Sequence, residues 1–551
     1  MKNKLAGSMM TLALAGALVC AGTVSAAEGD TKYDAEIYWY STVTGWGPTG
    51  WSSGVTDSPL TQTLKDRFGI TLNIEEPPTD ADTKLGLMIA TGDLPDVISS
   101  ANDDTINQLI ESGMVYPMEE FLTEYDPDSH LLVDFPEDIK QKVIDTYGGW
   151  YSLPSHLESP DMREVYTPNG LYLDGLEYGH NCAIMFNKTI MDELGITLED
   201  VQTEQGFYDT CEKVKTSGYT VNGQAVIPVV LHANDWINQS LDGIISETFG
   251  VVPVDENGSY RHMELDPGYK NALKFVNTLI TNEYLDVNSM TLDEAAIKVD
   301  LEGGRVFCWI GNPAQSGKKE QVPWVSAGPI LASNGATPVA PINMQAGKGW
   351  IQTFVSKDCE NPEAVAELLS FGSSEEGLTL NEYGVEGVDF NYVEGIAIRT
   401  EEGQQRYEND YAKNIALWPF ANTDFAYSRS VEPDDTMDNY YHLVITSAIA
   451  KYEGTYMYDS GLLDFTRGTV LEPSSDLGIK LSQVKNYLES QKAKIVSAAS
   501  EAAFEQEYQN MLDTLNDYSI SEIDAEFDKI LQQNFEKYGE TIENKNADLY
   551  K

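Results

Sequence analysis

Short apolar strands alternate with helical patterns along the chain from about residue 35 onward. Residues 35–42 and 70–74 show the two-residue alternation of strands, and residues 59–68 show helical spacing that ends at Gly69. This order of elements predicts α/β layers built on largely parallel sheets.

Residues 80–97, DADTKLGLMIATGDLPDV, join a short amphipathic helix to a turn and a buried strand. Leu85, Met88 and Ile89 recur at helical spacing. Gly92 follows the last helical residue, where a positive φ is tolerated without strain, and the proline of G-D-L-P-D can occupy only the start of a strand. The run therefore predicts a helix, a tight turn and a strand in close succession.

Helical patterning dominates the C-terminal part of the chain. Beyond about residue 401 apolar residues mostly recur at helical spacing, and residues 518–538 are the clearest example. Earlier in the chain, residues 269–283 predict another amphipathic helix. The Asn-Gly step of residues 255–259, DENGS, predicts a tight hairpin between extended runs.

The run of helix, G-D-L-P-D and strand resembles the signature of family 1 extracellular solute-binding proteins, the receptors that hand ligands to membrane ABC importers. Later segments resemble further parts of the same family in the expected order. They are GMVYPMEE from Gly113, GGWYSLP from Gly148, MDELGI from Met191, NPEAVAELLSFGSSEEG from Asn361 and YGVEGVDF from Tyr383. In GGWYSLP a serine replaces the glycine that the family usually has. The resemblance covers most of the chain.

The resemblance implies a two-lobed, periplasmic-binding-protein-like fold of type II, with two or three hinge crossings and a helical C-terminal region. The ligand would lie in the cleft at the carboxyl ends of the sheet strands, and lobe closure would be the functional motion. The expected division is residues 1–26 as signal peptide, 27–155 and 341–395 as the two parts of lobe 1, and 156–340 and 396–551 as the two parts of lobe 2, the last including a helical cap.

The N-terminus has the features of an export signal. Lys2 and Lys4 precede an apolar run over residues 9–24 that is too short to span a bilayer stably, and small residues end it, which predicts cleavage after Ala26. Cys20 is the candidate for a lipid anchor, as many receptors of this type are lipoproteins, but a valine precedes it where a small residue is needed. We therefore expect a protein that is secreted or held at the extracellular face of the membrane.

The net charge of the chain limits the classes of molecule that it can bind. The 88 acidic and 35 basic side chains give a formal charge of −53, which repels phosphate backbones and excludes nucleic acid as a partner. The same charge mildly disfavours strongly anionic ligands. The resemblance implies instead the permease subunits of an ABC importer as partner, and we expect a monomer.

The chain is rich in tyrosine and tryptophan, with 30 and nine residues respectively. Because pyranose C–H faces stack on flat aromatic rings while sugar hydroxyls need short polar partners, this surplus favours an oligosaccharide as ligand. The predicted ligand-binding residues are aromatic and amide side chains in or beside loops that follow strands. They are Trp46, Trp51, Asn102, Tyr151, Trp236, Asn238, Trp309, Asn312 and Trp350.

Some of these residues have a structural alternative. Trp309 and Trp350 would serve equally in core packing, and the polar residues around Trp236 and Asn238 would serve as a helix N-cap. Trp418, in an apolar cluster, is a weaker candidate. An oligopeptide receptor is the alternative function, since such receptors also have wide aromatic clefts.

An enzyme is disfavoured, and no catalytic residue is predicted. Residues 50–54, GWSSG, match the G-x-S-x-G elbow of serine hydrolases, but the preceding strand stops near Val43 and two glycines and a proline intervene. The six histidines form no metal-ligand spacing. An extracellular glycosidase remains a distant alternative.

The sequence predicts no cofactor, with one structural calcium site as an alternative. Asp286, Asn288, Asp293 and Glu294 form an oxygen-rich stretch that lacks the glycine and spacing of an EF-hand, so a solvated loop and helix start are favoured. Four cysteines remain after export, and apolar surroundings favour buried free thiols over disulfides. They are Cys182, Cys211, Cys308 and Cys359.

Overall fold

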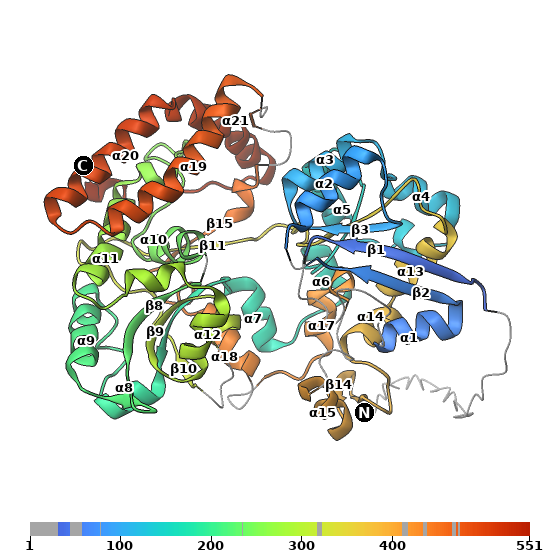
Figure 1. The fold of residues 1–551 in the computed structure, drawn as a ribbon, viewed down its shortest axis with the longest axis horizontal. Coiled ribbons are helices and arrows are strands. Elements are labelled where there is room, and N and C mark those ends of the chain that lie inside the picture. The colour runs from blue at the N-terminus through green and yellow to red at the C-terminus, as the bar shows by residue number, and fades with distance from the viewer. Residues whose placement is uncertain are drawn as a thin grey trace, which may run out of the picture.

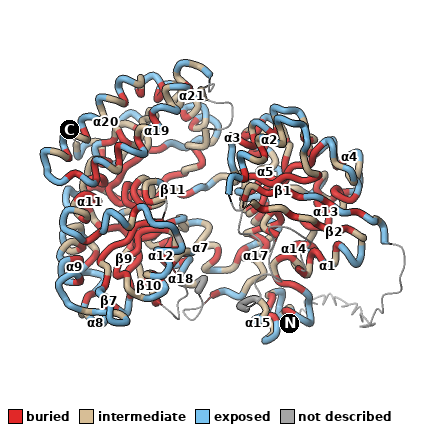
Figure 2. The backbone as a smooth tube through the Cα atoms, in the orientation of Figure 1, coloured by how far each residue is buried: buried red, intermediate tan, exposed pale blue. Residues whose placement is uncertain are grey.

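The computed structural model describes residues 31–43, 58–77, 79–233, 235–316, 322–409, 417–433, 438–465, 470–471 and 474–550. These residues form two α/β lobes that lie side by side, each with its own open sheet (Figure 1). Each lobe has a large cluster of buried apolar residues. In both lobes the buried residues lie at the centre and the exposed residues on the outside (Figure 2). The predicted two-lobed α/β class is confirmed.

The first lobe is built on a five-stranded sheet in the order β2, β1, β3, β12, β4. Its strands are β1 (Ala35–Ser41), β2 (Ile70–Glu75), β3 (Val97–Ser100), β4 (Leu153–Pro154) and β12 (Gln352–Val355). The outer strand β2 alternates buried and half-buried residues, whereas β3 in the middle of the sheet is buried throughout. A strand covered on both faces needs such a continuous apolar or satisfied polar sequence.

Helices cover both faces of this sheet (Figure 1). They are α1 (Pro59–Thr63), the π-helix η1 (Leu64–Phe68), α2 (Ala81–Thr91), α3 (Asp103–Glu111), α4 (Met118–Tyr125), η2 (His130–Leu132), α5 (Glu137–Tyr147), α6 (Pro160–Val165), α13 (Pro362–Ser373), α14 (Glu375–Glu382), α15 (Glu401–Asn409), η7 (Trp418–Phe420) and α17 (Thr423–Arg429). A hairpin of β13 (Phe390–Val393) and β14 (Ile396–Arg399) lies beside α15 and α17.

Two glycines end helices of the first lobe where the sequence predicts. Gly69 has φ +75° after η1, and a Cβ there would lie 2.0 Å from the Tyr33 carbonyl oxygen. Gly92 has φ +73° after α2, and its backbone N–H donates to the Met88 and Ile89 carbonyls. Left-handed backbone of this kind is easily adopted only without a side chain.

The second lobe is built on a four-stranded sheet in the order β10, β5, β9, β8. Its strands are β5 (Ala183–Asn187), β8 (Ile227–Leu231), β9 (Val306–Gly311) and β10 (Trp324–Val325), and further pairs are β6 (Thr220–Val221) with β7 (Gln224–Ala225) and β11 (Val339–Ile342) with β15 (Tyr456–Asp459). The surrounding helices are α7 (Gly170–Tyr178), α8 (Lys188–Leu194), α9 (Glu204–Thr216), the π-helix η3 (Trp236–Ile245), α10 (Ser246–Thr248), η4 (Met263–Leu265), α11 (Pro267–Thr281), η5 (Val287–Thr291), α12 (Glu294–Glu302), η6 (Pro313–Gln315), α18 (Asp438–Thr446) and η8 (Ser460–Leu463).

The prediction of largely parallel sheets is wrong. In the first lobe β1 pairs in parallel with β2 and β3, but β12 runs antiparallel to β3 and β4. In the second lobe β8 and β9 are parallel, but β5 runs antiparallel to β9 and β10. The physical reason is that the strand before β5 in the chain, β4, and the strand before β12, β11, belong to the other lobe, so no crossover helix on the same sheet forces β5 or β12 parallel.

Three long helices at the C-terminus form the predicted cap on the second lobe (Figure 1). They are α19 (Asp476–Val496), α20 (Glu501–Asp517) and α21 (Ile520–Tyr538). Apolar residues of all three helices, such as Leu488, Met511 and Ile523, belong to the same buried cluster as the sheet of the second lobe. The cap is therefore an integral part of that lobe.

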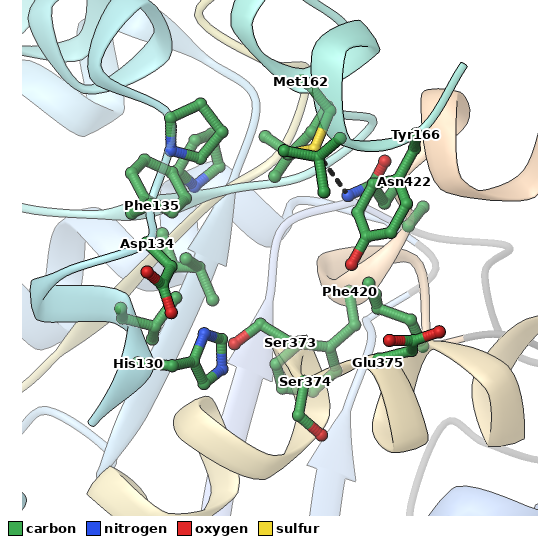
Figure 3. A pocket seen from close by; sticks show the side chains of 18 of the residues that line it. His130, Asp134, Phe135, Met162, Tyr166, Ser373, Ser374, Glu375, Phe420 and Asn422 are labelled. Atoms are coloured by element: carbon green, nitrogen blue, oxygen red, sulfur yellow. Dashed lines mark hydrogen bonds between the residues drawn. The ribbon is translucent and has the colours of Figure 1, made fainter. Parts of the chain in front are cut away.

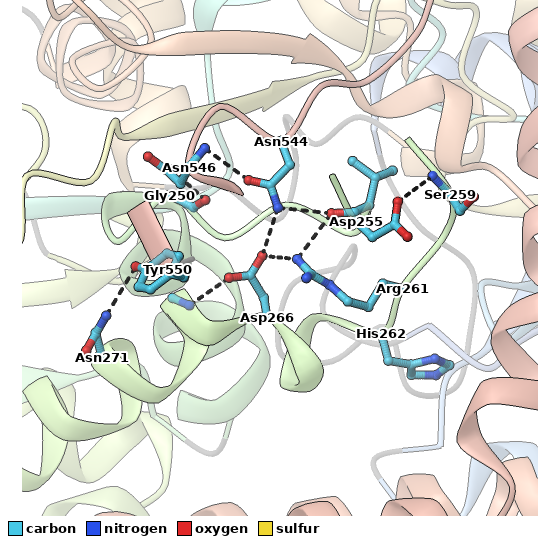
Figure 4. A network of polar contacts seen from close by, with 12 residues as sticks. Gly250, Asp255, Ser259, Arg261, His262, Asp266, Asn271, Asn544, Asn546 and Tyr550 are labelled. Carbon is cyan, nitrogen blue, oxygen red and sulfur yellow. Dashed lines mark hydrogen bonds and ion pairs between the residues drawn. The ribbon is translucent and has the colours of Figure 1, made fainter. Parts of the chain in front are cut away.

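The residues after α21 fasten the C-terminus to the second lobe (Figure 4). The Asn546 amide donates to the carbonyls of Gly250 and Thr337 at 2.9 and 3.0 Å, and its oxygen accepts from the Thr337 backbone N–H at 2.8 Å. The Tyr550 hydroxyl accepts from Asn271 at 3.2 Å. Asn546 is 5% exposed, so these bonds replace water for buried backbone groups.

Three connections between described elements pass from one lobe to the other, from α6 to α7, from β11 to β12 and from α17 to α18 (Figure 1). The structure thus places α6 and α17 in the first lobe, although the predicted division assigns residues 156–340 and 396–551 to the second. The reason is burial, because Met162 packs in the core of the first lobe and Phe425 packs on α14 and the β13–β14 hairpin. Tyr172 and Tyr427 stack across the hinge with ring centroids 4.4 Å apart.

Three of the cysteines are buried thiols without a bridge. Cys182, Cys211 and Cys308 lie in the second lobe, and Cys359 is half-buried in the first. Burial raises the pKa of the Cys182 and Cys359 thiols to about 12, so these groups stay protonated and unreactive at neutral pH. In the part of the chain that the structure describes, no helix combines the length and apolar character needed to cross a membrane.

Candidate ligand-binding site

One edge of the first sheet faces the second lobe. At this edge Gln352, the first residue of β12, pairs with Ser100 at the end of β3 and with Pro154 at the end of β4. Two of the three interlobe passages, after β4 and before β12, start at this edge. Because the chain connects to the second lobe at these ends of both β4 and β12, the second lobe must lie opposite this edge. The edge is also where the carboxyl ends of β1 and β3 meet, the usual ligand position in open α/β sheets.

Three rings from three different segments meet at this edge, and we call them the aromatic cluster: His156, Trp350 and Trp418. The His156 ring lies 5.3 Å from the Trp350 ring and 6.3 Å from the Trp418 ring, and the two indoles are 5.6 Å apart. Trp350 remains 49% exposed in spite of these contacts. A large ring that is fixed on one side and open on the other provides a surface for stacking a ligand.

His156 is held in an unusual backbone conformation beside the two indoles. Its φ is +54°, and its backbone N–H donates to the Ala421 carbonyl at 2.6 Å. Its Nδ1 lies 2.8 Å from the Ser155 hydroxyl. Burial lowers the pKa of His156 to about 4, so the imidazole is neutral at pH 7 and has both a donor and an acceptor nitrogen. Backbone strain of this kind is found preferentially at functional sites.

Polar side chains surround the aromatic cluster and are locked by each other. The Lys348 ammonium lies 2.7 Å from both carboxylate oxygens of Asp103, and the Tyr147 hydroxyl donates to Asp103 at 2.9 Å. Gln352 accepts from the Ser152 hydroxyl and donates to the Lys348 carbonyl, both at 2.7 Å. The positive charge nearest Trp350 in the sequence is therefore neutralised within the first lobe.

The second lobe presents an edge of amide side chains, which we call the amide edge: Asn181, Gln239 and Asn312. These residues lie at the start of β5, after β8 and after β9, and parallel β8 and β9 place their carboxyl ends together. Asn312 donates to Asn181 at 3.3 Å, and Asn181 donates to Gln239 at 3.1 Å. Amides of this kind offer paired donors and acceptors for hydroxyl groups.

The structure brings some of the predicted residues to these two edges. Trp350 lies in the aromatic cluster, and Asn312 lies in the amide edge, where its oxygen caps η6 by accepting from Ala314 at 2.9 Å. Asn102 follows β3, and its oxygen accepts from the Thr105 N–H at 3.1 Å, which fixes the side chain with its amide NH₂ as a donor for a ligand. Tyr151 is half-buried against the core of the first lobe, two residues before β4.

Other predicted residues occupy different positions. Trp309 is fully buried, its ring stacks near His232 at 5.9 Å, and its indole N–H donates to the Asn312 carbonyl at 3.3 Å. It packs in the core, the alternative that the sequence left open. Trp236 begins η3 and is 8% exposed, and Asn238 is exposed and donates to Asp235 at 2.6 Å. Trp46 and Trp51 lie outside the described residues, as does the GWSSG segment.

The site also includes residues that the sequence did not single out. His156, Asn181 and Gln239 were not predicted, and Trp418 was rated below the other tryptophans. A usable signal existed for His156, which directly follows the GGWYSLP strand at a predicted lobe crossing. The apolar neighbours of Trp418 concealed its role, since Pro419 and Phe420 are buried while Trp418 is only half-buried.

The oxygen-rich stretch proposed for calcium caps helices in the structure. The Asp286 carboxylate accepts from the Asn288 N–H at 2.9 Å at the start of η5, and Asp293 accepts from the Ala296 N–H at 2.8 Å at the start of α12. Nowhere among the described residues do three His, Cys, Asp or Glu side chains gather as a metal site would require. Asp286 and Asp293 thus act as helix caps here, and the calcium site stays a prediction.

A separate cavity of about 590 Å³ lies in the first lobe beside β4 (Figure 3). Its walls are mainly apolar, with Phe135, Met162 and Phe420 among them, and the Asn422 amide points at the Met162 sulfur at 3.6 Å. None of the predicted ligand-binding residues lines it. Its chemistry differs from that of the two edges, because it lacks the open indole and the run of amides.

Comparison with known proteins assigns the family. The family model for bacterial extracellular solute-binding proteins matches residues 53–379, more than half of the chain. The chain belongs to this family. The members are receptors, which agrees with the resemblance carried by the G-D-L-P-D run and the later segments.

Individual relatives have low sequence identity to this chain. The fructooligosaccharide ABC transporter substrate-binding protein FusA of Streptococcus pneumoniae is 24% identical over 284 residues, which are 49% of this chain and 50% of that protein. The matched part thus spans about half the length of that relative. The solved structure of S. pneumoniae FusA in complex with kestose has a TM-score of 0.66 at 17% identity and covers 92% of this chain and 100% of its own.

A human-milk-oligosaccharide (HMO) binding solute-binding protein associated with an ABC transporter, from Bifidobacterium longum infantis, gives a similar result. Its TM-score is 0.60 at 16% identity, over 90% of this chain and 98% of its own. At such identities the structural similarity shows the shared two-lobed fold.

Proposed function

We propose that this receptor captures an oligosaccharide between its lobes and delivers it to the permease subunits of an ABC importer. The observation that carries the proposal is the aromatic cluster at the edge where the chain crosses to the second lobe, with the half-exposed Trp350 ring at its surface. An indole stacks on the C–H face of a sugar ring, and the neutral His156 beside it can accept or donate to a hydroxyl.

The amide edge supports the same ligand class. Asn181, Gln239 and Asn312 already bond to one another, so their orientation is fixed before a ligand arrives. Pre-ordered polar groups reduce the entropy that binding costs. FusA and the HMO-binding protein, whose names specify oligosaccharides, share the fold and so agree with this choice.

Delivery to the importer would depend on closure of the two lobes about the three passages that join them. A ligand that contacts both edges binds the closed arrangement better than the open one and shifts the population toward it. The importer would then distinguish the loaded receptor by its closed shape. In this proposal the protein acts as a monomer outside the cell, after removal of residues 1–26 or with a lipid anchor at Cys20. Mass spectrometry of the mature N-terminus distinguishes cleavage after Ala26 from lipidation.

The test is direct titration of the purified protein with panels of oligosaccharides and short peptides, followed by calorimetry and by analysis of the sugars afterwards. We expect saturable binding of an oligosaccharide that is recovered intact. The variant Trp350→Ala should lose this binding. The matched control is Tyr38→Ala, because Tyr38 is an aromatic residue of the same lobe with the same 49% exposure but lies in the middle of β1.

Two outcomes would contradict the proposal. Binding of peptides alone would favour the oligopeptide receptor. Recovery of shortened sugars would favour a glycosidase, and loss of that product in Trp350→Ala would place the reaction at the aromatic cluster.

A further inference from the structure

A second cavity of about 610 Å³ lies in the second lobe, between η3 and the cap helix α19. From η3 it is lined by Trp236 and by the exposed amide of Asn238, and from α19 by the exposed side chains of Lys485 and Glu489. Its volume is within the range of about 300–1,000 Å³ that is typical of small-molecule sites. The cavity is a separate space from the one beside β4.

Deeper in this cavity lies a preformed network of charges. The Lys492 ammonium lies 2.5 Å from an oxygen of Asp242 and 2.8 Å from an oxygen of Glu264, and the Tyr269 hydroxyl donates to Asp242. Burial alone would lower the pKa of Lys492, but the two carboxylates raise it, so the ammonium stays charged. Because the network links η3, α11 and α19, it holds the walls of the cavity in place.

The cavity is linked to the amide edge by hydrogen bonds through one carboxylate. Asp235 lines the cavity and accepts from Asn238 at 2.6 Å and from Gln239 at 3.2 Å. Gln239 in turn accepts from Asn181 of the amide edge at 3.1 Å. One hydrogen-bonded run therefore leads from the amide edge into the cavity.

The charge and surface of the cavity indicate what it binds. Carboxylates outnumber ammonium groups among its lining residues, which disfavours an anionic group. Met290 and Leu488 add apolar wall beside the polar groups. A surface that is both apolar and rich in hydrogen-bonding groups matches a sugar ring, which has C–H faces and hydroxyl edges.

We propose that this cavity holds the terminal units of an uncharged oligosaccharide whose inner units lie between the aromatic cluster and the amide edge. The cavity would then select for chain length. This inference rests on the proposed function, since it requires that the ligand is an oligosaccharide.

The experiment measures dissociation constants for ladders of neutral fructo-, malto- and xylo-oligosaccharides from disaccharide to hexasaccharide. Wild-type affinity should rise with length within the ladder that binds. In Asn238→Ala and Glu489→Gln this rise should shrink by roughly three- to tenfold, the value of one lost hydrogen bond, while the shortest binding sugar is unaffected. Both side chains are exposed, so neither substitution should disturb folding.

Lys485→Ala should reduce the rise in the same way. Lys494→Ala is its matched control, because both lysines are exposed on α19 and only Lys485 lines the cavity. Equal affinities of wild type and variants for the longest bound sugar would overturn the inference while leaving the proposed function intact. Equal losses at every length would also overturn it, because the cavity would then act on the inner units. Failure of every sugar to bind would contradict the proposed function and this inference together.

Discussion

The ammonium of Lys142, in α5 of the first lobe, lies 2.8 Å from the carboxylate of Asp464 in the second lobe. A second pair has the opposite polarity, since Lys537 of the second lobe lies 2.9 Å from Asp145 of α5. Hydrogen bonds from Lys537 and Gln141 hold the pKa of Asp145 below its usual range although burial opposes them. The two pairs link the lobes at a place that is separate from the three chain passages.

Reversing the charge of Lys142 should destabilise the arrangement of the two lobes in this structure. The Lys142 side chain is only 8% exposed, so Lys142→Glu would leave two carboxylates face to face in a poorly solvated place, at a cost of about 1–3 kcal/mol for this arrangement. Small-angle scattering should report a larger radius of gyration, and the affinity for ligand should fall.

The double variant Lys142→Glu with Asp464→Lys restores a pair of opposite charges. It should recover the radius of gyration and the ligand affinity of the wild type. If the double variant behaves like the single one, the ion pair has no role in holding the lobes. The matched control is Lys140→Glu, since Lys140 lies on the same helix and its ammonium contacts Glu119 and the Trp150 ring, both of the first lobe.

His156 gives the protein a specific dependence on pH. Its pKa is lowered by burial from the ordinary 6.5 to about 4, so between these values the unfolded chain binds a proton that the folded protein does not. The contribution of neutral His156 to the free energy of unfolding is thus fully present above pH 6.5. It is lost as pH falls toward 4, by at most about 1.4 kcal/mol per pH unit.

Chemical denaturation of wild type and His156→Asn across this window tests the prediction. Asparagine tolerates the positive φ of this position and does not titrate. The stability difference between the two proteins should change in favour of the variant as pH falls. Parallel pH curves for the two would show that His156 does not titrate in this window.

Much of the local structure could be predicted from the sequence because short-range rules decide it. Gly69 and Gly92 end helices as their positions require, and α21 begins and ends within two residues of its predicted range. The buried thiols were also predicted, because Cys182 and Cys308 lie in or beside apolar strand sequences. These features depend on neighbours in the chain.

The candidate site depends on contacts between distant segments, which sequence patterns do not contain. His156, Trp350 and Trp418 come from three segments that are far apart in the sequence, and no periodicity relates them. Trp309 is a second example of what sequence patterns cannot show. Every residue of β9 is buried, so alternation of polar and apolar residues cannot reveal which ring is accessible. The antiparallel entry of β12 is equally a long-range property.

Asn546 should be a large contributor to the stability of the second lobe. Its side chain satisfies the backbone carbonyls of Gly250 and Thr337 and the Thr337 N–H, all far from it in sequence. Asn546→Ala leaves these groups without their partner and should cost about 2–4 kcal/mol of unfolding free energy. Thermal unfolding measures this loss.

The control is Asn510→Ala, because Asn510 is an exposed asparagine of the cap whose amide makes only a long contact of 3.4 Å with Glu507. That variant should unfold within about 0.5 kcal/mol of wild type. A similar result for Asn546→Ala would mean that the tail after α21 does not fasten the lobe.

Two tryptophans should separate stability from binding. Trp309 is fully buried in β9, so Trp309→Ala should lower the free energy of unfolding by about 3–5 kcal/mol. Trp350 is 49% exposed, so Trp350→Ala should change stability by less than about 1 kcal/mol and yet abolish oligosaccharide binding. Denaturation and calorimetry on the same two preparations distinguish the roles. If Trp309→Ala instead retains stability and loses affinity, the indole must turn toward the ligand in another lobe arrangement, which would return it to the binding role predicted from the sequence.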